Sequence, residues 1–191
     1  MKPYPISEIF YSIQGEGYWA GMPVIFIRLS GCNLKCPFCD TDHTTKSKLT
    51  PKQIATKIYP IRCDRVVITG GEPTIHDLQP LVDILKEHDY LVHLETNGTY
   101  PERIPWDVDW VAFSPKRLLT PVPNGTKEIK LLCGMDEWAT IAYDYLEPIP
   151  KVKWIGMQPI APKWEKPCLK FCMEHPHLRY SMQLHKKLGV R

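Results

Sequence analysis

The sequence lacks the features of several large protein classes. None of its apolar runs approaches the roughly 20 residues that cross a membrane, and residues 1–10 contain no apolar signal segment followed by a small-residue cleavage site. The 24 Lys and Arg and the 21 Asp and Glu leave a formal net charge of only +3, which argues against a dedicated nucleic-acid binder. We therefore expect a cytoplasmic protein whose partners include neither a membrane nor a nucleic acid.

Cysteine is also sparse. The seven cysteines among 191 residues are too few, and odd in number, for a disulfide scaffold. In a reducing compartment, clustered cysteines indicate metal or redox chemistry instead. Three of them, Cys32, Cys36 and Cys39, lie close together in the sequence.

The chain shows no internal repeat, low-complexity tract or convincing linker. Its length and its 43% hydrophobic and 24% charged residues suit a globular protein with one real core. We therefore expect a single domain over residues 1–191.

Short runs of apolar and β-branched residues alternate with helical segments. Thr50, Pro51 and Gln53 form an expected N-cap and capping box, and residues 78–87 carry apolar side chains at helical spacing. This alternation predicts an α/β fold with a mostly parallel sheet of about six strands. Strands are expected at residues 24–29, 65–69, 91–95, 110–113, 128–132 and 152–157.

The length limits how such a sheet can close. A complete eight-fold barrel takes about 250 residues, so we expect an abbreviated, incomplete (β/α) barrel with shortened helices, or an open sheet. In either arrangement ligands bind at the carboxyl ends of the strands. The unusual residues of this sequence follow strand ends.

The cysteine loop, residues 30–41, follows directly on the first of the six predicted strands with the spacing C-x3-C-x2-C. Thiolates bind zinc or iron–sulfur clusters. A structural zinc site needs four ligands, and the fourth could only be Cys63, His43 or a more remote residue. Three cysteines on a four-iron cluster leave one iron open for a substrate or cofactor. The spacing thus favours a cluster, with zinc and unligated thiols as alternatives.

With Phe38 before Cys39, this spacing resembles the radical S-adenosylmethionine (SAM) superfamily. In its members the open iron binds SAM, and reduction releases a 5′-deoxyadenosyl radical. The TGGEPT segment, residues 69–74, resembles the superfamily motif that holds the SAM amino group. Gly70 and Gly71 allow close backbone approach, and Glu72 offers an acceptor for an ammonium. Taken alone, the segment would be an ordinary strand-to-helix turn.

Further short motifs narrow the resemblance. They are SIQGEG at 12–17, Arg28, CDT at 39–41, ETNGT at 95–99, SPK at 114–116, MQP at 157–159 and the final QLHKKLGVR. In this order they resemble the 7-carboxy-7-deazaguanine synthase family over nearly the whole chain. The resemblance implies a ring-contracting lyase of queuosine and 7-deazapurine biosynthesis. It would convert 6-carboxy-5,6,7,8-tetrahydropterin to 7-carboxy-7-deazaguanine with loss of ammonia.

The resemblance also implies roles for single residues. Arg28 would bind the substrate carboxylate through its planar fork, although an ordinary ion pair is the alternative. His185 and the terminal carboxylate of Arg191 would close over the substrate. The complete set of implied substrate contacts is Ile13, Gln14, Gly15, Arg28, Thr96, His185 and Arg191.

For the cofactors, the resemblance implies a 4Fe-4S cluster on Cys32, Cys36 and Cys39, together with SAM and Mg²⁺. Thr41 would ligate Mg²⁺, which prefers a few hard oxygen ligands, while local capping is the alternative for Asp40 and Thr41. For Lys116 a solvated surface position is the alternative. The implied SAM contacts are Phe38, Cys39, Asp40, Gly70, Gly71, Glu72, Gly98, Ser114, Pro115, Lys116 and Gln158.

The implied partners are the pterin, a flavodoxin-like or other electron donor, and a second copy of the chain. Two other functions remain open: a small glycyl-radical-enzyme activase of the same superfamily, and a zinc-binding adaptor. We interpret Cys63, Cys133, Cys168 and Cys172 as packing thiols, the alternative being an auxiliary cluster.

Overall fold

The computed structural model describes residues 2–146 and 150–191. In this part of the chain nine strands form one sheet, in the order β3-β1-β2-β4-β5-β6-β7-β8-β9. The strands β2 and β4 to β9 pair in parallel, and β1 is antiparallel to both β2 and β3. Their bounds are β1 Tyr4–Ile13, β2 Pro23–Leu29, β3 Ser47–Leu49, β4 Arg65–Gly70, β5 Leu91–Thr96, β6 Trp110–Phe113, β7 Thr126–Cys133, β8 Trp154–Pro159 and β9 Arg179–Tyr180.

The six predicted strands are confirmed as β2 and β4 to β8, and three strands were missed. β1 is antiparallel and mostly half-buried, so it lacks the continuous apolar run of a parallel strand buried on both faces. β3 and β9 have three and two residues, too few for any periodicity. β3 and β9 are the two edges of the described sheet, so it is an incomplete barrel as expected.

The helices are short. They are α1 Pro51–Ile58, α2 Gln79–Glu87, α3 Trp138–Asp144, α4 Glu165–Glu174 and α5 Leu184–Leu188, with single 3-10 turns at η1 Pro73–Ile75, η2 Pro101–Arg103 and η3 Pro162–Trp164. The predicted capping box begins α1: Gln53 N donates to Thr50 Oγ1, and Thr50 N donates to Gln53 Oε1. None of the helices in the described residues is long and apolar enough to span a membrane.

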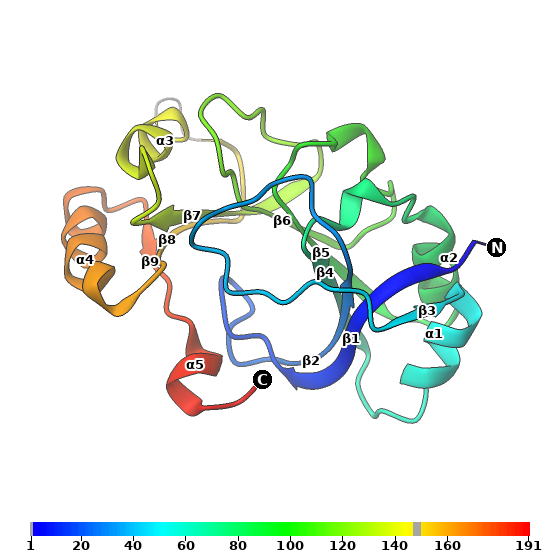
Figure 1. Ribbon diagram of the computed structural model, residues 1–191. Coiled ribbons are helices and arrows are strands. Elements are labelled where there is room, and N and C mark those ends of the chain that lie inside the picture. Colours follow the sequence, from blue (N-terminus) through cyan, green and yellow to red (C-terminus); the bar gives the residue numbers. More distant parts are fainter. Residues whose placement is uncertain (1, 147–149) are drawn as a thin grey trace.

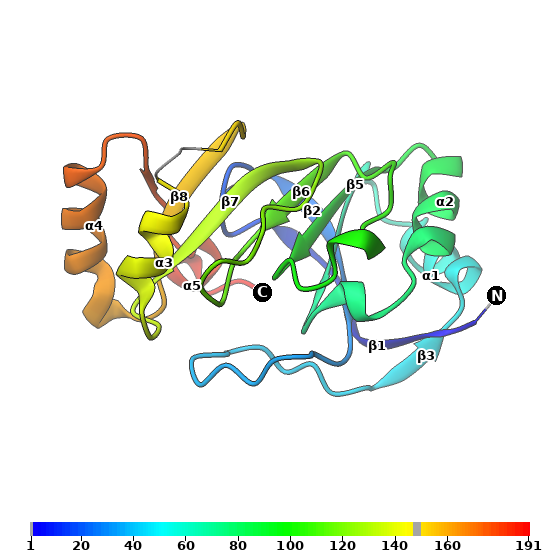
Figure 2. The ribbon, with the colours of Figure 1, turned by 90° about the horizontal axis from the view of Figure 1, so that it is seen from above.

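The helices cover one face of a curved sheet. Figures 1 and 2 show α1 and α2 at one end of the curve and α3 and α4 at the other. Alternate strand residues such as Ile27, Ile68 and Leu94 pack under α1 and α2, and Ile129 and Met157 belong to the core beneath α3 and α4. The intervening residues of each strand therefore face the concave side.

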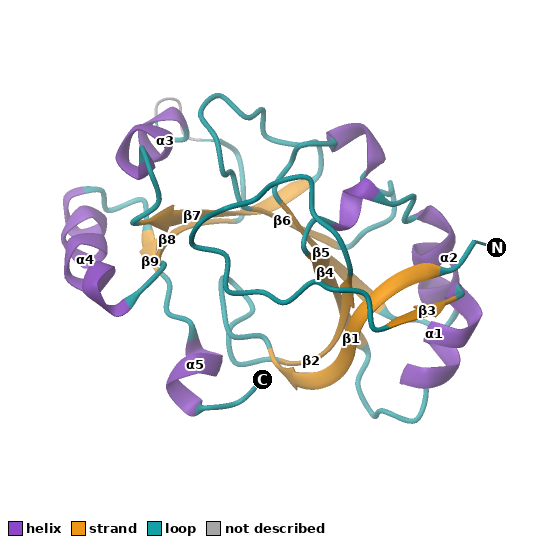
Figure 3. Cartoon of the chain, in the orientation of Figure 1, coloured by secondary structure: helices purple, strands orange, loops and turns teal. Residues whose placement is uncertain are grey.

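The concave side is left to loops. In Figure 3 the long loop after β2, which contains the cysteines, crosses in front of the curve, and α5 lies below it. Each of β2, β4, β5, β7 and β8 contributes a polar residue to the cavity: Arg28, Thr69, Glu95, Lys130 and Gln158.

Candidate active site

The concave face encloses a cavity of about 840 Å³. Strand ends, the cysteine loop, the β1–β2 loop and the C-terminal segment all contribute to its wall. Nearly every predicted site residue lines it: Ile13, Gln14, Gly15, Arg28, Cys32, Cys36, Phe38, Cys39, Asp40, Thr41, Gly70, Gly71, Glu72, Thr96, Ser114, Lys116, Gln158, His185 and Arg191.

Gly98 and Pro115 are not among the lining residues. Gly98 has φ +77°, and a Cβ added there would overlap the ring of Phe113. This packing and the left-handed backbone give one reason for glycine here, and the close approach of a cofactor to Gly98 stays a prediction. Pro115 is buried between two neighbours that do line the cavity.

The cysteine loop rests directly on the TGGEPT turn. Glu72 N donates to Gly31 O at 3.0 Å. A Cβ on Gly71 would overlap Gly31 O and lie 2.7 Å from Cys32 Cβ, so glycine is required for this contact. Two motifs about 40 residues apart in the chain are thus brought together by one close backbone approach.

The three loop cysteines are free thiols at the cavity wall. Burial raises the pKa of Cys36, and Cys32 and Cys39 raise it further, whereas Lys116 and Arg117 lower it. In residues 2–146 and 150–191 no three His, Cys, Asp or Glu side chains converge as ligands of one metal ion. The three thiols of a 4Fe-4S cluster need not meet at a single point, because each thiol binds a different iron. Three thiols beside two cations therefore fit a three-cysteine cluster.

Glu72 is buried, and four donors bind its carboxylate. Oε1 accepts from Thr74 N (3.0 Å), Thr74 Oγ1 (2.6 Å) and Thr96 Oγ1 (2.7 Å), and Oε2 accepts from Asn97 N (2.6 Å). This carboxylate links the turn after β4 to the end of β5. Because a carboxylate oxygen has two lone pairs, Oε2 still has room for one more donor, such as an ammonium.

A polar layer that the sequence reasoning missed forms the floor of the cavity. Glu95 accepts from Gln14 Nε2 at 3.0 Å and from Thr69 Oγ1 at 2.9 Å. Glu16 forms an ion pair with Lys130 and accepts from Gln183 Nε2 at 2.8 Å. Glu16 lies in the SIQGEG motif and Glu95 in the ETNGT motif, where only neighbouring residues were predicted to contact substrate or cofactor.

Lys130 carried a signal of its own in the sequence. It is a charged residue between the apolar Ile129 and Leu131 of β7, and a charged residue is rarely buried without a partner. The position of that partner, however, could not be read from the strand itself.

The electrostatics of this layer follow from burial and pairing. Burial alone would raise the pKa of Glu16, but the Lys130 ammonium outweighs it and holds the pKa at about 2. Burial alone would lower the pKa of Lys130, but Glu16 and Glu95 keep it above its ordinary range. The pair is therefore ionised throughout the physiological range.

Lys116 is not a solvated surface lysine. Its Nζ donates to Ser114 Oγ at 2.6 Å inside the cavity, and Ser114 Oγ in turn donates to Lys130 O at 2.8 Å. Burial, together with the charge of Lys130, lowers the pKa of Lys116 to about 8. At neutral pH the amine is mainly protonated and available to an anion.

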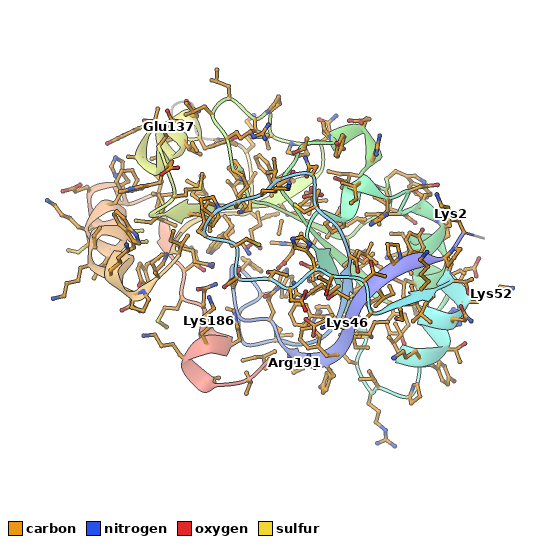
Figure 4. All side chains as sticks on the ribbon, viewed as in Figure 1. Lys2, Lys46, Lys52, Glu137, Lys186 and Arg191 are labelled. Atoms are coloured by element: carbon orange, nitrogen blue, oxygen red, sulfur yellow. The ribbon has the colours of Figure 1, made fainter. Side chains whose placement is uncertain are left out.

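The C-terminal segment covers the mouth of the cavity. Leu184 N donates to Gly15 O at 2.8 Å, and Lys186 forms an ion pair with Asp40 of the cysteine loop. A Cβ on Gly15 would overlap the His185 ring, so His185 lies against the motif predicted to bind substrate. Figure 4 shows Lys186 and Arg191 on this C-terminal segment.

The other four cysteines separate into two groups. Cys133, Cys168 and Cys172 are buried in the core beneath α3 and α4, with Cys168 on α4 one turn from Cys172. Cys63 packs against the other core and its thiol donates to Pro23 O. An auxiliary cluster that combines Cys63 with the other three is therefore wrong, because the two cores hold them apart.

Comparison with known proteins agrees with this geometry. The model of the Radical SAM superfamily matches residues 26–116. A 7-carboxy-7-deazaguanine synthase of Synechocystis sp. is 37% identical over 203 aligned positions, which cover 98% of this chain and 94% of that protein. The enzyme of that name from Bacteroides thetaiotaomicron is 38% identical, with 97% and 98% covered.

A solved structure is similar over the same extent. The crystal structure of QueE from Escherichia coli superimposes with a TM-score of 0.80 at 31% identity, and the match covers 96% of this chain and 95% of that one.

Proposed function

Because the chain belongs to the 7-carboxy-7-deazaguanine synthase family of radical SAM proteins, we propose that it catalyses that family's ring contraction. The substrate is 6-carboxy-5,6,7,8-tetrahydropterin, the product is 7-carboxy-7-deazaguanine, ammonia is released, and the reaction serves 7-deazapurine and queuosine biosynthesis. The observation that carries this proposal is the meeting of the cysteine loop, the TGGEPT turn and the predicted pterin contacts in one cavity. Residues 1–191 act as a single catalytic domain.

The family implies a 4Fe-4S cluster and SAM, which together supply radical hydrogen abstraction when bound. Cys32, Cys36 and Cys39 hold the cluster. The free lone pair of Glu72 Oε2 accepts the SAM ammonium, and the Lys116 ammonium pairs with its carboxylate. The remaining cofactor contacts come from Phe38, Asp40, Gly70, Gly71, Ser114 and Gln158, all of which line the cavity.

The pterin lies over the polar floor. Gln14, whose amide is held by Glu95, meets the amide edge of the pterin together with Ile13 and Gly15. Such a set of donors and acceptors rejects analogues that lack the matching groups. Arg28 binds the carboxylate, while Thr96, His185 and the Arg191 carboxylate complete the enclosure. Thr41 lines the cavity, and its hydroxyl would be a ligand of Mg²⁺, which prefers a few hard oxygen ligands.

The family resemblance also supports a homodimer, a cytoplasmic location and reduction by a flavodoxin-like or other electron donor. Sedimentation of the loaded enzyme tests the first of these. A single species with the mass of one chain would contradict the dimer.

Anaerobic reconstitution tests the activity. We expect about four irons and about four sulfides per chain, and conversion of carboxytetrahydropterin to the deazaguanine when SAM, Mg²⁺ and reductant are added. Cys36→Ala is the matched control and should abolish both cluster and product. An activase would form 5′-deoxyadenosine but no deazaguanine, and this result would refute the proposed substrate. A zinc-binding adaptor would hold one zinc per chain and no sulfide, and this result would refute radical SAM chemistry.

A further inference from the structure

Two arginines share one carboxylate at one end of the cavity. Arg28 Nε lies 2.8 Å from Glu8 Oε1, and Arg191 Nη2 lies 2.7 Å from Glu8 Oε2. The side chains of Arg28 and Glu8 are only 19% and 20% exposed, whereas that of Arg191 is 69% exposed. All three residues line the cavity. Arg191 therefore lies over a pair that is already largely enclosed.

An aromatic platform supports both guanidinium groups. The Cζ atoms of Arg28 and Arg191 lie 6.0 Å and 5.4 Å from the centre of the Phe10 ring. Phe10 stacks in turn on Phe26, with 4.9 Å between ring centres. Guanidinium groups are attracted to aromatic rings at such distances, so the ring helps to hold both cations beside Glu8.

The backbone of Arg191 is held as well. Ser12 Oγ donates to Arg191 O, and Lys186 of the same segment pairs with Asp40. The guanidinium of Arg191 thus reaches Glu8 from an anchored main chain.

The charges at this end balance only with the Arg191 side chain in place. Two guanidinium groups offset the Glu8 carboxylate and the main-chain carboxylate of Arg191, which Ser12 Oγ holds at the same end. Within residues 2–146 and 150–191, Arg28 pairs with protein only through Nε, so its two terminal nitrogens remain free. Those two nitrogens form the fork that matches a carboxylate.

We propose that the Arg191 side chain and Glu8 are specificity-determining residues for the substrate carboxylate. Glu8 orients Arg28 through Nε, and Arg191 neutralises Glu8. Without the Arg191 guanidinium, Glu8 and the main-chain carboxylate of Arg191 outnumber Arg28, and the excess negative charge repels an incoming anion. With it the charges balance and the free nitrogens of Arg28 remain available to the substrate carboxylate. This inference rests on the proposed function, because it takes a carboxylated pterin as the ligand.

Binding to the cluster-loaded, unreduced enzyme with SAM separates this role from a merely structural one. Titration calorimetry under anaerobic conditions should show that Arg191→Gln raises the Kd of carboxytetrahydropterin about tenfold, or about 1.4 kcal/mol. The Kd of 6-methyltetrahydropterin, which lacks the carboxylate, should not change. Arg179→Gln, which removes an exposed arginine from outside the cavity, is the matched control and should change neither value.

A second variant tests the part played by Glu8. If Arg191 acts by neutralising Glu8, its replacement in a Glu8→Gln background should raise the Kd of carboxytetrahydropterin less than about threefold. An equal effect in both backgrounds would overturn that mechanism.

The remaining outcomes distinguish this inference from the proposed function. If Arg191→Gln weakens the binding of both pterins equally, or of neither, the inference is overturned and the proposed function still stands. Failure of the unmutated enzyme to bind carboxytetrahydropterin would overturn both.

Discussion

Glu72 shows how much of the cavity depends on single buried side chains. Its carboxylate accepts four hydrogen bonds from Thr74, Thr96 and Asn97, and it is 1% exposed. An amide of the same shape has one acceptor oxygen and one donor group. Either orientation of a glutamine would therefore direct N–H groups at backbone or hydroxyl donors.

We expect Glu72→Gln to lower the free energy of unfolding by about 1–3 kcal/mol, the cost of unsatisfied buried polar groups. Urea denaturation followed by circular dichroism measures the change. Glu87→Gln, on the exposed surface of α2, is the control and should stay within about 0.5 kcal/mol of the unmutated chain. Equal free energies of unfolding for Glu72→Gln and Glu87→Gln would show that the four hydrogen bonds make no net contribution to stability.

The turn after β4 fixes the position of the cysteine loop. The loop has no regular secondary structure over residues 30–46, so its position depends on the elements that it touches. Gly71 is one such contact, because a side chain there would meet Gly31 O and Cys32 Cβ. Backbone packed against backbone at this point aligns the cysteines with the turn.

Gly71→Ala should therefore displace the loop and lower the iron and sulfide content after reconstitution, at a stability cost of about 1–3 kcal/mol from overpacking. Iron and sulfide assays with a thermal melt measure both effects. Gly21→Ala is a control for backbone strain alone, since Gly21 has φ +90° and open space around it. It should cost about 1–2 kcal/mol and leave iron content unchanged. A loss of iron in both variants would point to general destabilisation.

For the whole molecule, one ion pair joins distant parts of the chain across the cavity floor. Glu16 in the β1–β2 loop and Lys130 in β7 are 114 positions apart, and their side chains are 17% and 11% exposed. Because both are enclosed, removal of one partner leaves an uncompensated buried charge.

Lys130→Met should lower the free energy of unfolding by about 3–5 kcal/mol, and Glu16→Gln in addition should restore part of that loss. The pH dependence gives a second readout. The Glu16 pKa falls from 4.5 to about 2 on folding, so its contribution to stability is complete above pH 4.5 and is lost as the pH falls towards 2.

The melting temperature of the unmutated chain should decline over that window, whereas the Lys130→Met variant should lose this part of the decline. Parallel pH profiles for the two proteins would show that Lys130 does not set the pKa of Glu16.

Several features could be predicted from local sequence. β2 and β4 to β8 were identifiable because strands buried on both faces are nearly continuous apolar runs, and α1 because Thr50 and Gln53 form a capping box. The cysteine loop and the TGGEPT turn were identifiable because both follow strand ends, where ligands bind in parallel sheets.

The sequence by itself thus determined the parallel strands, their carboxyl-end motifs and, through the order of those motifs, the family. Only the tertiary structure decided which partners these residues take: Lys130 for Glu16, Phe113 beside Gly98, and Arg191 for Glu8. The physical reason is that strand and helix patterns depend on neighbours a few positions away. An ion pair across the cavity depends instead on how the strands are ordered and how far the sheet curves, which no local pattern encodes.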